Sequence, residues 1–313
     1  MRLAKFALAG VMILALGIAG CNENDNPTNP PATPNAPTAL MATSRSETTV
    51  GLKWTAPATG AAPTGYTVNY TANGVTNSLN TTGTTLDVPG LTEGTIYTFT
   101  VVSKNGTASS VASGAIMWAP AKRLTGTFKI YSSKSTTNGS GLRFNPAAVL
   151  KIDQGEQWDI CFDNKDGKPL VGSPGVSGYV DVNAEFPNGK VAKLVATGRD
   201  YTGVNSLDEI YDVDSLSVAP TGGFHENLKD LSTVPDQTKG YAFVVRSRVD
   251  PNTVNFAKVL VKSNGTGFVQ GTGNEQYIEV EVSYQTLTNV PYALVAPLEQ
   301  AAKLRENNQR RAK

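Results

Sequence analysis

Short segments that alternate apolar and polar residues fill most of this sequence after Pro37, and they constrain its fold more than any other feature. The segments 50–54 and 66–70 both place large apolar side chains on every second residue. A period of two is typical of β-strands that bury one face. Asn73 and Gly74 separate two such segments and predict a tight hairpin turn. The sequence therefore predicts an all-β protein.

Residues 37–119 contain a spacing that is specific to one kind of β-sandwich. Trp54 lies in an early strand, and Leu91 precedes Tyr97 by six residues. In this combination the region resembles the fibronectin type III domain. The resemblance implies a seven-stranded immunoglobulin-like sandwich in which Tyr97 makes the corner hydrogen bond of the family. We expect the domain to act as a spacer rather than as a binding module.

Residues 1–20 have the pattern of a signal peptide, with a basic start and an apolar run over residues 6–19 that is short for a membrane span. The small residues before Cys21 resemble the bacterial lipobox, which implies cleavage after residue 20 and lipid attachment to the Cys21 thiol. An ordinary secretory peptide is the alternative. Because Asn22 is not the aspartate that signals inner-membrane retention, we expect a lipid-anchored protein of the outer membrane or cell surface, with a periplasm-facing position left open.

The segment 21–36 follows this cysteine and contains four prolines but no large apolar side chain, so it predicts an extended tether. Loss of residues 1–20 removes two of the 27 basic residues, which leaves 25 against 26 acidic residues. A nucleic-acid partner is not expected for a chain so close to neutral. Once Cys21 carries lipid, Cys161 alone cannot form an internal disulfide.

Residues 124–290 again show the strand pattern and form a second, larger β domain. Residues 157–162 are followed by the strands 241–246, 255–261 and 277–284. The sequence, order and spacing of these motifs resemble the HmuY-type haem-binding lipoproteins. The resemblance implies an all-β domain that grips its ligand between long hairpin loops.

Haem is the ligand implied by this resemblance, and a haem-carrying protein is the corresponding partner. The gripping loops would lie within residues 169–240. Members of the family use two His or Met side chains as axial ligands, whereas this chain has a single histidine, His225, and no methionine after Met117. The candidate iron ligands are therefore His225 alone, or His225 with a tyrosinate such as Tyr201 or Tyr211, and the alternative is that His225 is a solvated loop residue. No other cofactor or metal is predicted.

Other groups of residues give weaker indications. The acidic stretch 206–214 contains four carboxylates, which predict either a calcium site or a solvated turn, and the turn is preferred. Cys161 alternates with Trp158, Ile160 and Phe162, so we expect it to be packed on the opposite face and unreactive. No catalytic motif is recognised, and an enzyme is not expected.

The last segment, 291–313, shows helical spacing after Pro297 and ends in a polar, basic tail. Taken together, these features predict a surface-anchored lipoprotein whose second domain binds haem or another porphyrin. The alternative is an adhesion or envelope-structural protein that binds a glycan or protein partner and has no haem site.

Overall fold

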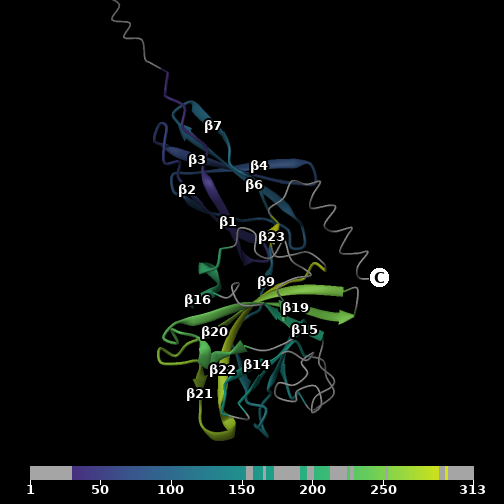
Figure 1. Ribbon diagram of the computed structural model, residues 1–313. Helices are drawn as coiled ribbons and strands as arrows, with labels where there is room; N and C mark the ends of the chain where they lie inside the picture. Colours follow the sequence, from purple (N-terminus) through teal and green to yellow (C-terminus); the bar gives the residue numbers. More distant parts are fainter. Residues whose placement is uncertain are drawn as a thin grey trace, which may run out of the picture. The chain divides into compact units, whose positions relative to one another are not determined.

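A computed structural model describes residues 30–152, 158–164, 167–172, 191–195, 201–211, 224–225, 229–250, 253–288 and 293–294. Residues from Pro31 onward form one compact unit, distinct from residues 1–30. The predicted signal peptide, Cys21 and the predicted C-terminal helix lie outside the described residues. The described chain is all-β, as predicted, and its only helices are single 3₁₀ turns (Figure 1). No helix in these ranges is long and apolar enough to cross a membrane.

The first module is a sandwich of two antiparallel sheets. One sheet has the order β1-β2-β5, and the other has the order β23-β8-β6-β3-β4 with β7 also paired to β6. The strands are β1 (Thr38–Ser46), β2 (Thr49–Thr55), β3 (Gly65–Ala72), β4 (Val75–Thr81), β5 (Thr85–Val88), β6 (Tyr97–Asn105), β7 (Ala108–Ala112), β8 (Ile116–Trp118) and β23 (Ala293–Leu294).

Two local predictions for this module are confirmed. Asn73 and Gly74 connect β3 to β4 with φ angles of 51° and 79°, as a two-residue hairpin turn requires. The backbone N–H of Thr92 donates a hydrogen bond to the Tyr97 hydroxyl at 3.0 Å, which is the expected corner bond. Trp54 is buried, and its ring meets that of Tyr66 edge-on at 5.4 Å between centroids.

The second module is also built from two sheets. The larger has the order β10-β22-β20-β19-β15-β17 with β9, β16 and β21 attached, and the smaller has the order β12-β11-β13-β14-β18. Its elements are β9 (Lys122–Arg123), β10 (Phe128–Tyr131), β11 (Gly141–Phe144), β12 (Ala147–Leu150), β13 (Ile160–Asp163), β14 (Leu170–Gly172), β15 (Val191–Val195), β16 (Tyr201–Val204), η1 (Leu207–Glu209), β17 (Phe224–His225), β18 (Lys229–Asp230), η2 (Leu231–Thr233), β19 (Gly240–Asp250), β20 (Thr253–Lys262), β21 (Val269–Gln270), η3 (Gly273–Glu275) and β22 (Tyr277–Gln285).

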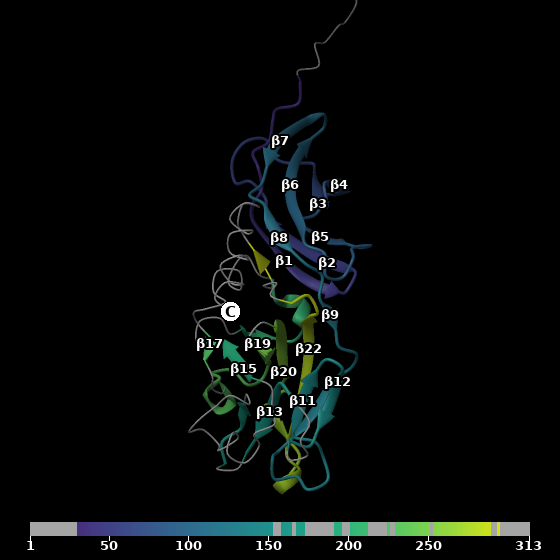
Figure 2. The same cartoon turned by 90° about the vertical axis from the view of Figure 1, so that its right-hand side faces the viewer.

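The core of the second module lies between these two sheets, whose strands appear together in Figure 2. The long strands β19, β20 and β22 alternate as predicted, so that Phe243, Val259 and Val280 all point into this core. The expectation that Trp158 shares a face with Ile160 and Phe162 is wrong. Trp158 packs against Cys161 instead, because β13 begins only at Ile160 and the alternation does not extend back to residue 158.

The two modules are joined closely. Only Ala119, Pro120 and Ala121 separate β8 from β9, and all three are buried. Near the other end of the second module, β23 pairs with β8 of the first. The chain therefore crosses between the modules twice, which does not fit a freely hinged spacer domain.

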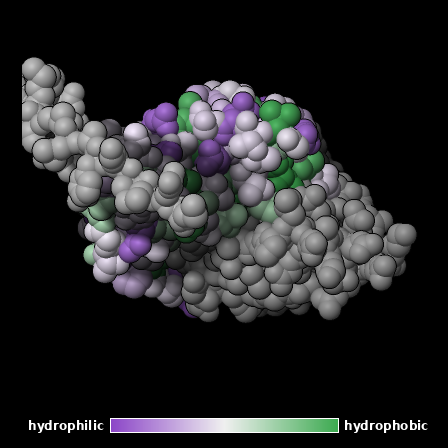
Figure 3. All heavy atoms as spheres, turned by 90° about the horizontal axis from the view of Figure 1, so that it is seen from above, coloured by the Kyte–Doolittle hydropathy of each residue, from purple (hydrophilic) through white to green (hydrophobic). Residues whose placement is uncertain are grey.

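Surface apolar side chains are a minor feature of the first module. Hydrophilic and hydrophobic residues are mixed over the described surface seen from above (Figure 3). Val75 and Val111 are strongly exposed, at 61% and 79%. Single apolar side chains of this kind are normal and do not by themselves indicate a binding surface.

Candidate functional site

The three predicted haem ligands lie on different elements. Tyr201 is on β16 and packs against a small cluster that includes Leu207 and Ile210. The backbone of His225 pairs with Leu194 at the β17 edge of the large sheet, and its side chain lies outside the described residues. Tyr211 follows η1. Haem ligation by these residues stays a prediction.

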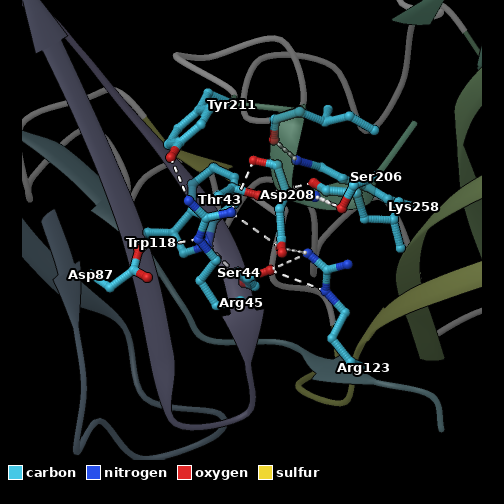
Figure 4. Close-up of polar contacts among 12 residues, drawn as sticks. Thr43, Ser44, Arg45, Asp87, Trp118, Arg123, Ser206, Asp208, Tyr211 and Lys258 are labelled. Carbon is cyan, nitrogen blue, oxygen red and sulfur yellow. Dashed lines mark hydrogen bonds and ion pairs between the residues drawn. The ribbon is translucent and has the colours of Figure 1, made fainter. Parts of the chain in front are cut away.

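Tyr211 belongs to a polar cluster between the two modules, which we call the junction cluster: Thr43, Ser44, Arg45, Asp87, Trp118, Arg123, Asp208, Tyr211 and Lys258 (Figure 4). Arg45 on β1 is at its centre. Its Nε donates to Asp87 Oδ1 at 3.1 Å, and its Nη1 donates to the main-chain oxygen of Asp208 at 3.0 Å. Its Nη2 donates to the Tyr211 hydroxyl at 2.6 Å.

Asp208 is held from both sides of the junction. Arg123 Nη2 donates to Asp208 Oδ1 at 2.7 Å and to the Ser44 carbonyl at 2.7 Å. The Arg45 Nη1 atom lies 3.3 Å from the same carboxylate oxygen. The Ser206 side chain accepts the backbone N–H of Asp208, which fixes the start of η1. One carboxylate thus joins η1 to two cations on other strands.

A buried lysine completes the cluster. Lys258 on β20 is only 2% exposed, and its Nζ lies 5.0 Å from the centre of the Trp118 ring. It also donates to the Ile210 carbonyl at 3.5 Å. Trp118 Nε1 donates to Ser44 Oγ at 2.9 Å. A cation over an indole face is stabilised by the ring's negative potential, especially where water is excluded.

The electrostatics of the cluster favour a fixed structure over proton transfer. Burial raises the pKa of Tyr211, and the opposing effect of Arg45 does not outweigh it. Partial burial works against the charge on Arg45, but its hydrogen bond with Asp87 and the nearby Tyr211 and Asp208 raise its pKa overall. Neither group would change protonation near neutral pH, so the cluster is suited to holding η1 against the first module.

The described ranges give little support for a metal site or for a reactive thiol. No three His, Cys, Asp or Glu side chains gather there in a way that could hold a metal ion. Asp208 in the acidic stretch pairs with arginines, as a calcium ligand would not, while Asp212 and Asp214 lie outside the described residues. Burial, followed by the nearby Asp163, raises the pKa of the Cys161 thiol, which is fully buried.

A second candidate surface lies on the outer face of the large sheet, away from the junction. Gln270, Tyr277 and Tyr131 face one another across β21, β22 and β10, and we call them the tyrosine row. The two tyrosine rings are 5.1 Å apart between centroids and tilted by 42°. The Tyr277 hydroxyl donates to Gln270 Oε1 at 3.3 Å. Lys129 Nζ lies 4.6 Å from the Tyr277 ring centre. Both rings are partly exposed.

Polar side chains adjoin the tyrosine row. Glu275, two residues before Tyr277, accepts hydrogen bonds from Ser135 at 2.9 Å and from Asn138 at 2.8 Å. These bonds, that from Asn138 first, lower the pKa of Glu275. The same segment therefore offers aromatic faces beside amide, hydroxyl and carboxylate groups.

Neither surface follows from a sequence motif. Arg45 and Asp208 are ordinary charged residues far apart in the chain, and Tyr131 lies in a short strand without a recognisable pattern. The available signal was the period of two, which places Tyr131 and Tyr277 on the solvent side of their strands because Ile130 and Ile278 are buried. It could not show that the two strands are neighbours.

Comparison with known families supports the predicted fold of the first module. Residues 35–132 match the family model of the fibronectin type III domain. The match continues past Ala119 into β9 and β10, although both strands pair with β22 and so belong to the second module's sheet.

Two curated proteins are similar to parts of this chain. Chitinase A1 of Niallia circulans is 39% identical over 84 residues, which are 26% of this chain and 12% of that protein. Chitinase C of Streptomyces lividans is 26% identical over 219 residues, which are 68% of this chain and 32% of that protein. The chain thus spans less than a third of the length of either relative.

Two solved structures are each similar to a little more than a quarter of this chain. The FN5 domain of Drosophila Lar is 20% identical and covers 28% of this chain and 97% of its own, with a TM-score of 0.26. Domains A168–A170 of titin are 29% identical and cover 27% of this chain and 31% of their own, with a TM-score of 0.25. By its family match and its strand pairing, the described chain is an all-β protein in which a fibronectin type III domain is followed by a second module of two β-sheets.

Proposed function

We propose that this protein is a non-catalytic, surface-anchored protein that binds carbohydrate through its second module. The observation that carries the proposal is the tyrosine row, in which two partly exposed rings lie side by side on a sheet and are flanked by hydrogen-bonding side chains. A sugar ring has a face of C–H groups that packs on an aromatic ring, while its hydroxyls bond to amides and carboxylates at the edge.

The row is preorganised for such a ligand. Tyr131 and Tyr277 are directly paired residues of β10 and β22, so the sheet fixes their separation. Gln270 accepts a hydrogen bond from the Tyr277 hydroxyl, and Lys129 Nζ lies over the Tyr277 ring. A ligand would lose little affinity to ordering these side chains.

The names of the similar proteins indicate a first substrate to test. Both are chitinases, and their similarity to this chain supports a carbohydrate-related role without requiring catalysis. Insoluble chitin is therefore the first polysaccharide to try, with cellulose as a neutral comparison. If the protein binds neither chitin nor cellulose, an adhesion role on a protein partner would be indicated.

The test is a depletion assay in which the full mature protein is mixed with insoluble chitin and the unbound fraction is measured. We expect Tyr277→Ala and Tyr131→Ala each to weaken binding about tenfold, since an aromatic contact contributes about 1 kcal/mol beyond its buried area. Tyr277→Phe keeps the ring and is the matched control, with near-normal binding. Equal binding by all variants would remove the row from the site, and failure to bind any polysaccharide would contradict the function.

Anchoring through Cys21 is the second part of the proposal and rests on the lipobox-like sequence. Metabolic labelling with a fatty acid should mark the wild-type protein and leave Cys21→Ser unlabelled. Label in the variant would mean that the lipid, if any, is attached elsewhere.

Haem is the alternative ligand, and it rests on the family resemblance. The Tyr211 hydroxyl already accepts from Arg45, and its raised pKa disfavours the tyrosinate that iron would need. A haemin titration followed by absorbance would test the alternative. A saturating shift that is lost in His225→Ala would establish it, and a shift that survives would direct attention to Tyr201 and Tyr211. No shift would leave carbohydrate as the better ligand.

A further inference from the structure

The second module contains a cavity that is separate from the tyrosine row. Its volume is about 330 Å³, near the lower end of the range typical of ligand sites, so it would hold one ring rather than a polymer. It lies between the segment from Lys122 to Phe128 and the turn between β11 and β12, with Tyr284 between them. Phe128 and Tyr131 point to opposite faces of β10, so the cavity and the row do not share a surface.

Hydrogen bonds hold the floor of the cavity in place. The backbone N–H of Phe144 donates to Asp159 Oδ2 at 2.7 Å, and Ser247 donates to the other carboxylate oxygen. The Phe144 and Tyr284 rings lie 6.0 Å apart, and the Tyr284 hydroxyl is hydrogen-bonded to the Asn145 side chain. Apart from Asn145, which is exposed, these groups are buried, so the floor does not have to form when a ligand enters.

The walls offer one open aromatic face rather than two. Phe144 and Tyr284 are only 1% and 6% exposed, whereas Phe128 is partly exposed. A flat aromatic ligand would need apolar contact on both of its faces. A sugar ring needs it on one face and hydrogen-bonding groups around its edge, which Thr125 and Asn145 supply.

The charge at the rim is positive. Lys122 is exposed and is the charged side chain among the lining residues. Arg143 donates from Nε to the Pro146 carbonyl at 3.0 Å but is not among the lining residues. Asp159 opposes Lys122 from beneath the floor, but both of its oxygens already accept hydrogen bonds there. An anionic group would therefore lie at the rim and not in the interior.

We propose that this cavity binds a single acidic monosaccharide, with the sugar ring on Phe128 and its carboxylate beside Lys122. The site is independent of the tyrosine row, so a protein that fails to bind chitin can still bind the acidic sugar here. The volume suits a single ring, the open face of Phe128 suits the face of a sugar, and Lys122 at the rim suits its carboxylate.

Isothermal titration of the full mature protein with glucuronate, and with glucose as the uncharged comparison, tests the proposal. We expect glucuronate to bind more tightly than glucose, Lys122→Gln to weaken glucuronate binding about threefold as for an exposed ion pair, and Phe128→Ala to weaken both sugars. Lys239→Gln, on an exposed turn elsewhere, is the matched control and should bind normally.

Tyr277→Ala separates the two sites, because it should impair chitin binding and leave glucuronate binding unchanged. Equal affinity for the two sugars would overturn the assigned charge preference. No saturable binding of either sugar, or binding that survives both Lys122→Gln and Phe128→Ala, would overturn the site.

Discussion

The side chain of Arg45 forms hydrogen bonds with residues of both modules. Its guanidinium extends from β1 and contacts Asp87 in its own module and both Asp208 and Tyr211 in the second. The planar fork of arginine allows these contacts to form at the same time, which a lysine ammonium could not reproduce. The residues after β16 are therefore held by the first module as well as by their own sheet.

We predict that Arg45→Ala lowers the free energy of unfolding by about 2 kcal/mol, because it removes the donor that Arg45 supplies to the Asp208 main-chain oxygen and to the Tyr211 hydroxyl in a partly buried place. Arg45→Lys should recover less than half of this loss. Urea denaturation of the protein would measure both variants. A loss no larger than that of the exposed-site control Lys239→Ala would mean that the cluster contributes little stability.

Glu275 gives a prediction about acid stability. Its pKa is below the ordinary value of 4.5 because Asn138 and Ser135 donate hydrogen bonds to the carboxylate. A carboxylate with a lowered pKa in the folded state stabilises the fold above its ordinary pKa, and this contribution is lost as the pH falls through the folded-state pKa. The stabilisation should therefore decline below pH 4.5.

Urea midpoints at about pH 6 and about pH 3.5 would check this for wild type and Glu275→Gln. We expect wild type to lose more stability between the two values than Glu275→Gln does. Glu47→Gln, on an exposed turn, is the control and should behave as wild type. An identical pH dependence in Glu275→Gln would contradict the assignment.

Among the strands, β8 makes the contacts that join the two modules. It pairs with β6 inside the fibronectin type III domain and with β23, and its last residue, Trp118, reaches Ser44 and Lys258. A strand edge left unpaired is open to association with other chains, and β23 occupies this edge from within the same chain. The short strand β8 thus contacts both modules.

Trp118→Ala should destabilise the protein by about 3 to 5 kcal/mol, since it removes a fully buried indole and leaves Lys258 without its aromatic partner. Trp118→Phe keeps an aromatic ring over the lysine but loses the bond to Ser44, so we expect roughly half of that cost. Thermal unfolding followed by circular dichroism would rank the three proteins. A loss under about 1 kcal/mol for Trp118→Ala would show that the junction repacks around the gap.

Over the whole molecule, the two modules share part of their interior. Val244 and Phe256 belong to the second module's sheet, yet they pack in the core cluster of the fibronectin type III domain with Trp54 and Phe99. Each fully buried side chain of this size contributes about 1.5 to 3 kcal/mol. A boundary drawn at residue 119 therefore does not separate two independent folding units.

We predict a single cooperative unfolding transition for the described unit. Phe256→Ala should lower the thermal unfolding midpoint of the first module as well as that of the second. Hydrogen exchange of the amides in β3 and in β20 would follow the two modules separately. Loss of protection in β20 alone would show that the modules unfold independently. Val75→Ala, at a strongly exposed residue, is the control and should change neither midpoint by more than about 1 °C.

Alternation and turn residues alone predict the class of fold, the strands that bury one face and the hairpin turn at Asn73, and the family resemblance predicts the corner bond of Tyr97. All of these depend on residues close together in the chain, where the period of two and the turn conformation act directly. Which strands are neighbours is seen only in the folded protein. The fold brings Tyr131 beside Tyr277 and Arg45 to Asp208, which is 163 residues away along the chain. Alternation specifies which face of a strand is buried but carries no information on the partner across the sheet, and that partner is set by packing of the complete core.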